Sequence, residues 1–360
     1  MYCAQGERLK TGKTVFLIIL VLIVSSHAKT DSLQTTPLDS FPIQKDVFHL
    51  KTYEPTRVGY SCADGEGVSL KNSCASNGFM DFFISIEYPF FEFYSDYLNA
   101  SFNKKLHINS KIQLIPVPLI TFSGRFAQYI ATRRSSPVVS KSFNPKLLLR
   151  WGKPADNYRL EIGYAHESNG QSISDSLAYL RERANDSIQE HENGFPYFSM
   201  ETDEKLSRGW DFFDANYRLF LHVYRSRFTL FGNYKYFFPV GIIQGSADNK
   251  RTWESMGLDI KRQEVDGLFF SVEYKQNVSW YILEFPRKWK RDTPTFGNPR
   301  LLLSARTGIK NSFDYNTLRT EVSFDILGFP ISLFYQRGYL NDLSMYYHYG
   351  STIGASFILR

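Results

Sequence analysis

The chain has 360 residues, enough for a large core or a barrel, with a net charge of +6 and a mean hydropathy of −0.30. The charge is scattered, and no basic run with interleaved aromatic residues occurs, so the composition argues against a nucleic-acid partner. Aromatic residues make up 16% of the chain, yet after residue 28 no apolar stretch is long enough for a membrane-spanning helix.

Residues 1–28 are predicted to be an export signal. Lys10 and Lys13 precede an unbroken apolar run at residues 15–24, and the tripeptide Ser-His-Ala ends at residue 28. About ten apolar residues are too few to cross a bilayer as a helix, and the small residues are typical of a signal-peptidase site. We therefore expect an exported chain.

Residues 29–78 are polar and rich in Thr, Ser, Asp and Gly, which predicts an N-terminal arm. This arm carries Cys62 and Cys74, the two cysteines that follow the signal. An exported protein meets an oxidising compartment, so we expect a local disulfide between them. Two unpaired thiols in a flexible arm are the alternative.

From Phe79 onward, short segments alternate between apolar and polar residues and are separated by turn-like clusters. Residues 267–275, 318–326 and 352–359 show this pattern most clearly. The side chains of a strand alternate between its two faces, so each segment has one apolar and one polar face. A soluble sandwich would bury the apolar face, whereas an outer-membrane barrel turns it toward lipid and lines its interior with the polar face.

Three observations favour the outer-membrane barrel. The chain is expected to be exported, aromatic residues gather at strand ends such as residues 234–238 and 280–281, and charged residues recur on the polar face. A strand of about 9–11 residues crosses a membrane, so residues 79–360 hold about twelve strands with their turns. The sequence therefore predicts an all-β fold, a transmembrane antiparallel barrel in a bacterial outer membrane.

The stretch YAHESNGQ, residues 164–171, raises the possibility of serine chemistry on this wall. His166 and Ser168 continue the apolar face that Ile162 and Tyr164 begin, so they should face lipid. Their Cα atoms are two strand rises apart, about 6.6 Å, so an imidazole and a hydroxyl can meet there as base and nucleophile. A polar strand end running into a turn is the alternative.

A serine hydrolase needs a third group that orients its histidine. In the next strand, within residues 207–224, Asp211 lies on the apolar face, while Asp214 and Asn216 should point into the barrel. Strand parity therefore selects Asp211. Polar groups on a lipid-facing wall are costly and tend to be functional, which favours catalysis over a simple strand end.

These residues resemble a known family. The motif GYAHESNGQ followed by LSRGWDFFDANYR is similar to the outer-membrane phospholipase A family, whose signature is a His-x-Ser-Asn-Gly strand end and a Ser-Arg-x-Trp-Asn strand start. Residues 135–150 and the closing hairpin at 334–359 also resemble that family. The similarity covers roughly residues 79–360.

The resemblance implies a twelve-stranded barrel that hydrolyses the acyl esters of membrane glycerophospholipids, with A1, A2 and lysophospholipase action. Ser168 would be the nucleophile and His166 the general base, and the Gly170 amide would form part of the oxyanion hole. Asp211 takes the orienting position, where the family usually has Asn. Replacing Asp211 by Asn should therefore retain most activity.

The resemblance also implies calcium and a homodimer that forms when the enzyme is active. Calcium would be held by the Gln171 carbonyl, the Ser207 hydroxyl and the partner subunit's Ser135, all oxygen ligands that a hard cation prefers. A long charged insertion at residues 172–206 separates the two halves of the motif, which puts the calcium ligands in question. Residues 175–189 in it have a helical pattern, and the insertion could be a solvated loop or a lid. A non-enzymatic outer-membrane barrel, either a channel or an inactive relative, is the alternative function.

Overall fold

The structure is a computed structural model. It describes residues 50–65, 78–107, 113–129, 138–152, 157–171, 173, 175–193, 202, 205–243, 245–246, 260–280, 296–339 and 349–359. Within these ranges no helix is long and apolar enough to cross a membrane. The predicted signal, Cys74 and Ser135 lie outside the described residues. Residues 51–360 form one compact unit.

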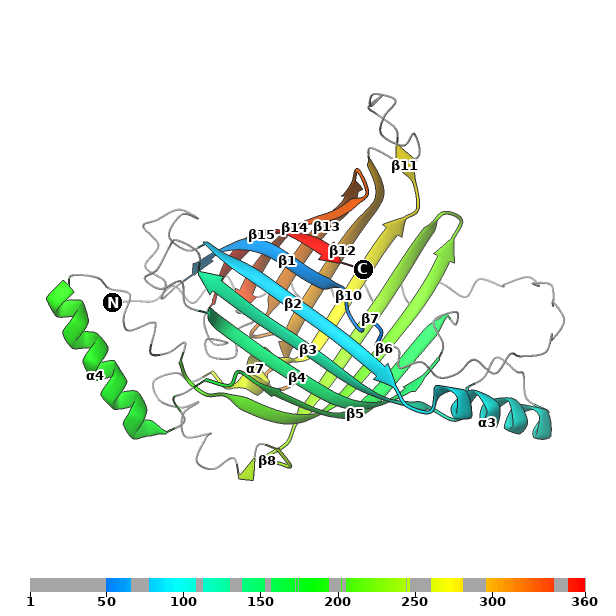
Figure 1. Ribbon diagram of the computed structural model, residues 1–360, viewed down its shortest axis with the longest axis horizontal. Helices are drawn as coiled ribbons and strands as arrows, with labels where there is room; N and C mark the ends of the chain where they lie inside the picture. Colours follow the sequence, from blue (N-terminus) through cyan, green and yellow to red (C-terminus); the bar gives the residue numbers. More distant parts are fainter. Residues whose placement is uncertain are drawn as a thin grey trace. The chain divides into compact units, whose positions relative to one another are not determined.

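Twelve long strands of the described ranges close into an antiparallel barrel (Figure 1). They are β1 (Thr56–Gly65), β2 (Gly78–Pro89), β3 (Val117–Tyr129), β4 (Val138–Trp151), β5 (Tyr158–Ser168), β6 (Gly209–Val223), β7 (Ser226–Phe237), β10 (Gly267–Gln276), β12 (Phe296–Gly308), β13 (Thr317–Ile326), β14 (Phe329–Tyr339) and β15 (Tyr349–Leu359). Consecutive strands pair, and β1 pairs with β15, so no edge remains open. The predicted barrel and its strand number are confirmed.

The remaining elements lie in the connections between the barrel strands. They are α3 (Glu92–Lys105), α4 (Ser176–Asn193), α7 (Arg262–Val265), β8 (Val240–Gly241), β9 (Gly245–Ser246) and β11 (Ser279–Trp280). The segment with β8 and β9 follows β7, and α7 precedes β10.

The barrel begins at Thr56 and not at Phe79, where we expected it to begin. Strand β1 lies within the range assigned to the N-terminal arm and pairs Thr56 with Leu359 at the closing seam. Two of its inward positions, Gly59 and Ser61, carry small residues where the neighbouring strand is close: a Cβ on Gly59 would lie 2.5 Å from the Ala355 carbonyl oxygen. The strand has only two large apolar side chains, Val58 and Tyr60, which is why its sequence resembles an arm. Cys62 lies in β1 and is disulfide-bonded.

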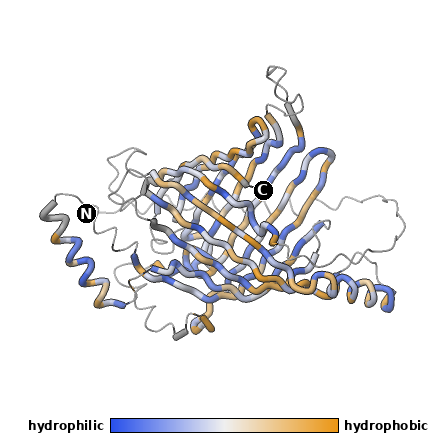
Figure 2. Tube along the Cα trace, viewed as in Figure 1, coloured by the Kyte–Doolittle hydropathy of each residue, from blue (hydrophilic) through white to orange (hydrophobic). Residues whose placement is uncertain are grey.

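The two faces of the barrel wall differ as the sequence predicted. Figure 2 shows hydrophobic and hydrophilic residues mixed along the strands. Large apolar side chains are exposed on the outer face, among them Ile84, Ile86, Ile120, Phe122, Leu147, Leu149, Leu333, Ile353 and Phe357. Buried charged side chains line the inner face, among them Glu87, Arg150, Glu161, Asp214 and Glu321. One closed sheet with this distribution excludes a two-sheet sandwich.

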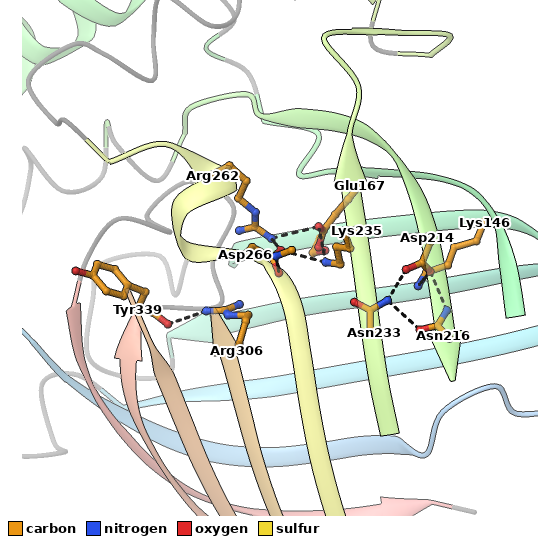
Figure 3. A network of polar contacts seen from close by, with 12 residues as sticks. Lys146, Glu167, Asp214, Asn216, Asn233, Lys235, Arg262, Asp266, Arg306 and Tyr339 are labelled. Atoms are coloured by element: carbon orange, nitrogen blue, oxygen red, sulfur yellow. Dashed lines mark hydrogen bonds and ion pairs between the residues drawn. The ribbon is translucent and has the colours of Figure 1, made fainter. Parts of the chain in front are cut away.

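Charged side chains pair inside the barrel (Figure 3). Lys146 donates to Asp214 at 2.6 Å, and Asp266 accepts from Lys235 at 3.1 Å and from Arg262 at 2.6 Å. Burial alone would raise the pKa of Asp266, which precedes β10, but the two cations hold that pKa well below its usual range. These pairs satisfy the inner face, so the wall presents its apolar side to lipid.

Candidate active site on the outer wall

The predicted His166 and Ser168 lie at the end of β5, where the barrel wall meets its rim. In the β5–β6 ladder His166 stands opposite Asp211, and Ser168 stands opposite Gly209. Directly opposed residues of an antiparallel pair point to the same face, with Cβ atoms about 4.5–5.5 Å apart. His166, Ser168 and Asp211 therefore share one face, as strand parity indicated.

Glu167 determines which face this is. Its carboxylate is buried on the inner side, where it accepts hydrogen bonds from Ser142 at 3.1 Å and Arg262 at 3.3 Å. Figure 3 shows Glu167 directed toward Arg262 and Lys235. Because neighbouring side chains on a strand alternate, this inward anchor turns His166 and Ser168 toward the outer surface.

His166 and Asp211 form a direct polar contact. His166 Nδ1 lies 2.5 Å from Asp211 Oδ1, and Asp211 is fully buried. A carboxylate can only accept, so this contact requires the proton on Nδ1 and leaves Nε2 with a free lone pair. That tautomer is the one a general base needs.

Ser168 approaches His166 over Gly209. A Cβ placed on Gly209 would lie 3.5 Å from both His166 Cε1 and Ser168 Cβ, so the two side chains border the same small space. No hydrogen bond joins the side chains of His166 and Ser168 within the described ranges. Serine–histidine contacts of resting enzymes are often long and shorten when substrate binds. Our sequence reasoning missed Gly209, although glycine in a strand signals such a close approach.

A segment after β7 supplies a second donor to Asp211. The Ile243 N–H donates to Asp211 Oδ2 at 2.9 Å, and the Phe238 N–H donates to the Asp211 carbonyl at 2.9 Å. Gly241 packs against the carboxylate, because a Cβ there would lie 1.7 Å from Oδ2. The sequence carried no signal for this contact, since a backbone amide donates it. Each carboxylate oxygen thus has its own N–H donor.

Asn169 joins the two ends of the long insertion. Its Nδ2 donates to the Leu206 carbonyl at 2.6 Å, and its Oδ1 accepts from the Arg208 N–H at 2.8 Å. Ile173 bridges to Leu206, and the Ser207 N–H donates to the Ile173 carbonyl at 2.7 Å. The insertion therefore leaves and returns at one place, and does not drive the two halves of the motif apart.

Gly170 follows directly after Asn169 and has a left-handed backbone, with φ of 56°. Glycine takes this conformation without strain, and the residue is exposed at the rim. Its N–H has no backbone acceptor among the described residues. The oxyanion role that the motif implies for this amide stays a prediction.

Helix α4 occupies the insertion and covers the predicted helical stretch. The Asp175 carboxylate accepts from the Ala178 N–H at 2.8 Å, a capping contact that favours the helix start. Lys205 pairs with Glu182 at 2.8 Å, which ties the helix to the returning strand end. The predicted helix is present as α4, and the choice between a lid and a solvated loop stays a prediction.

The predicted calcium ligands are partly described. Gln171 and Ser207 lie at the foot of the insertion, next to the Asn169 contacts, and both carry oxygen donors. No group of three or more His, Cys, Asp or Glu residues that could hold a metal ion occurs in the described part of the chain. The predicted ligands are a carbonyl and hydroxyls, so they are compatible with this finding, and their chemistry fits calcium.

A closed antiparallel ring with an apolar outer face and a charged interior defines a multi-pass β-barrel of the outer membrane. No protein-family model matches the chain, and no curated protein matches its sequence.

Several solved barrels share the fold. The Salmonella typhi outer membrane phospholipase dimer with bound calcium has 15% identity and a TM-score of 0.50, over 88% of this chain and 94% of that one. Outer membrane phospholipase A from Escherichia coli has 14% identity and a TM-score of 0.50, over 86% and 94%. An active-site mutant of the Escherichia coli enzyme has 13% identity and a TM-score of 0.52, over 88% and 94%. At these identities the similarity concerns the fold.

Proposed function

We propose that the chain belongs to the outer-membrane phospholipase A family and hydrolyses acyl esters of glycerophospholipids. The observation that carries the proposal is the 2.5 Å contact between His166 and Asp211 on the lipid-facing wall, with Ser168 beside it. A buried histidine–carboxylate pair on that wall is expensive without a function. The fold shared with outer membrane phospholipases supports the same conclusion.

The proposed reaction uses these residues in fixed roles. Ser168 Oγ attacks the ester carbonyl while His166 Nε2 takes its proton, and Asp211 stabilises the imidazolium that forms. The Gly170 N–H donates to the oxyanion. His166 then protonates the leaving alcohol, so a lysophospholipid departs and an acyl-serine remains. Water enters from the rim and hydrolyses the acyl-serine, with His166 again as the base.

Calcium and a second subunit complete the proposal. The Gln171 carbonyl, the Ser207 hydroxyl and the partner subunit's Ser135 would hold the ion, which would polarise the ester carbonyl. The hydrogen bonds of Asn169 support this assignment, because they hold the two described ligands at the foot of one loop. We propose a homodimer for the same reason, because the third calcium ligand would be the partner subunit's Ser135.

Replacing Ser168 by Ala tests the nucleophile. We expect calcium-dependent release of fatty acid from mixed phospholipid–detergent micelles to fall by more than about a thousandfold, because the acyl-serine can no longer form. Chelator should abolish the activity of the unsubstituted chain. Ser351→Ala is the matched control, since Ser351 lies on the outer wall near the start of β15, at the same end of the barrel as Ser168. Hydrolysis that survives in Ser168→Ala would exclude Ser168 as the nucleophile.

The non-enzymatic alternative rests on space inside the barrel. Two interior cavities of about 300 and 510 Å³ share Arg125, Arg319 and Glu54 in their lining. A channel would use this space, and its ion conductance would depend on these charged residues. It would give no hydrolysis in either the unsubstituted chain or Ser168→Ala, so the same assay separates the two functions.

A further inference from the structure

Helix α3, which connects β2 to β3, buries polar side chains instead of apolar ones. Ser95, Asn99 and Asn103 follow each other at four-residue spacing and form its buried face. Asn99 Nδ2 donates to the Ile115 carbonyl at 2.9 Å, while its Oδ1 accepts from the N–H groups of Leu114 and Ile115, both at 2.7 Å. These hydrogen bonds fix the rotation of the helix against the segment that enters β3.

The rest of the helix surface is rich in exposed aromatic and aliphatic side chains. Seven large apolar residues on or beside α3 are between 40% and 68% exposed: Phe91, Phe93, Tyr94, Tyr97, Leu98, Phe102 and Leu106. Several rings already pack together, with centroids 6.2 Å apart for Phe91–Tyr94 and 5.9 Å for Phe93–Tyr94. An exposed apolar surface of this size on a rigid element indicates a binding partner.

The position of α3 along the barrel identifies that partner as lipid. Strands β2 and β3, which α3 connects, expose Ile84, Ile86, Ile120 and Phe122 on the outer wall, so the helix follows directly on a lipid-facing strand. The helix lies at the end that also carries the two-residue turns at 224–225 and 327–328 (Figure 1). Short turns mark the periplasmic end of an outer-membrane barrel.

We propose that α3 is an interfacial membrane helix that inserts its aromatic side chains into the glycerophospholipid leaflet at the periplasmic end. Tyrosine and phenylalanine are favoured at the level of lipid head groups, where one part of the ring is buried and the other stays near water. Lys104 and Lys105, exposed in the last turn, would meet the lipid phosphates. The helix then sets the depth of the barrel in the membrane, independently of any hydrolysis.

Spin labelling of the full chain tests this placement. Nitroxide labels at Phe93→Cys and, separately, Tyr97→Cys would be measured in vesicles of ether-linked phosphatidylglycerol and phosphatidylcholine, which contain no acyl ester. Collision rates with oxygen, which concentrates in lipid, are compared with those of a water-soluble nickel chelate. Leu333→Cys on the outer wall is the lipid reference, and Asp314→Cys in the β12–β13 connection is the water reference. The unsubstituted chain, carried through labelling, corrects for native cysteines.

We expect both α3 labels to have oxygen-to-nickel ratios closer to that of Leu333 than to that of Asp314. Ratios equal to the water reference at both sites would overturn the proposal, because the aromatic surface would then face the aqueous phase. Strong spin–spin broadening at either site would also overturn it, in favour of contact with a second copy of the chain. A difference in gel mobility between unheated and heated samples confirms that each labelled barrel is folded.

Discussion

Asp211 accepts hydrogen bonds on both carboxylate oxygens, from His166 on one and from the Ile243 N–H on the other. An asparagine at this position offers a single acceptor oxygen, and its NH2 group would face one of the two N–H donors. The resemblance alone suggested that Asp211→Asn would retain most activity. In this chain the additional backbone donor explains why a carboxylate suits the position.

We therefore expect Asp211→Asn to lower the hydrolysis rate by about 10–100-fold. The lost hydrogen bond to a charged group is worth roughly 1.5–3 kcal/mol, and each 1.36 kcal/mol corresponds to about tenfold in rate. Asp211→Ala should lose more, since neither donor is then satisfied. The measurement is kcat/KM on phospholipid micelles, with exposed Asp314→Asn as the control. A fully active Asp211→Asn would show that the Ile243 contact does not matter for catalysis.

The insertion shows how an element can be long in sequence and local in space. It contains all of α4, yet Asn169 and the Ile173–Leu206 bridge close it at its base. The hydrogen bonds of one buried amide thereby hold Gln171 and Ser207 near each other. Calcium binding should depend on this closure more than on the helix itself.

Asn169→Ala is expected to raise the calcium concentration for half-maximal hydrolysis by about tenfold or more. A buried donor or acceptor left without its partner costs about 1–3 kcal/mol, and about 1.4 kcal/mol is tenfold in affinity. Titrating calcium in the hydrolysis assay measures the shift. Asn277→Ala, in the exposed segment after β10 at the other end of the barrel, should leave the calcium dependence unchanged. If both variants had the same calcium dependence, the loop closure by Asn169 would not contribute to calcium binding.

The barrel as a whole is held by ring closure and by a buried charged interior. Glu321 on β13 is 1% exposed and pairs with Arg57 on β1 at 2.6 Å, Arg319 at 2.7 Å and Arg300 on β12 at 3.4 Å. The contact with Arg57 reaches β1, which does not pair with β13, so it connects the wall across the interior. Removing one member of such a cluster leaves buried cations without a partner.

Glu321→Gln should destabilise the barrel by about 3–5 kcal/mol, the usual cost of breaking a buried pair. Glu92→Gln removes the exposed pair with Lys51, at 3.1 Å, and should change stability little because solvent screens it. Urea titration in detergent, followed by the gel mobility of the folded barrel, compares the two variants. Equal midpoints would contradict a structural role for the interior cluster.

Much of the fold and part of the candidate site could be predicted from the sequence because strand parity is a local rule. Alternation in residues 318–326 was enough to predict a lipid-facing wall, and the same rule put Asp211 on the face of His166. We did not recognise β1 by this rule, because Val58 and Tyr60 are its only large apolar residues and its inward positions include the small Gly59 and Ser61. Gly59 and Ser61 are small because strand β15 lies close to them, and no local sequence pattern reveals that neighbour.

The sequence by itself determined the barrel, the alternation of its faces and the three residues that share the outer wall, since each depends on side-chain type at period two. Only the tertiary structure decided which backbone groups complete the site. The Ile243 amide, the space over Gly209 and the closure by Asn169 all join segments that are distant along the chain, and a local sequence pattern does not show which distant segments meet. The rotation of α3 was decided in the same way, because its buried asparagines bond to backbone that follows the helix.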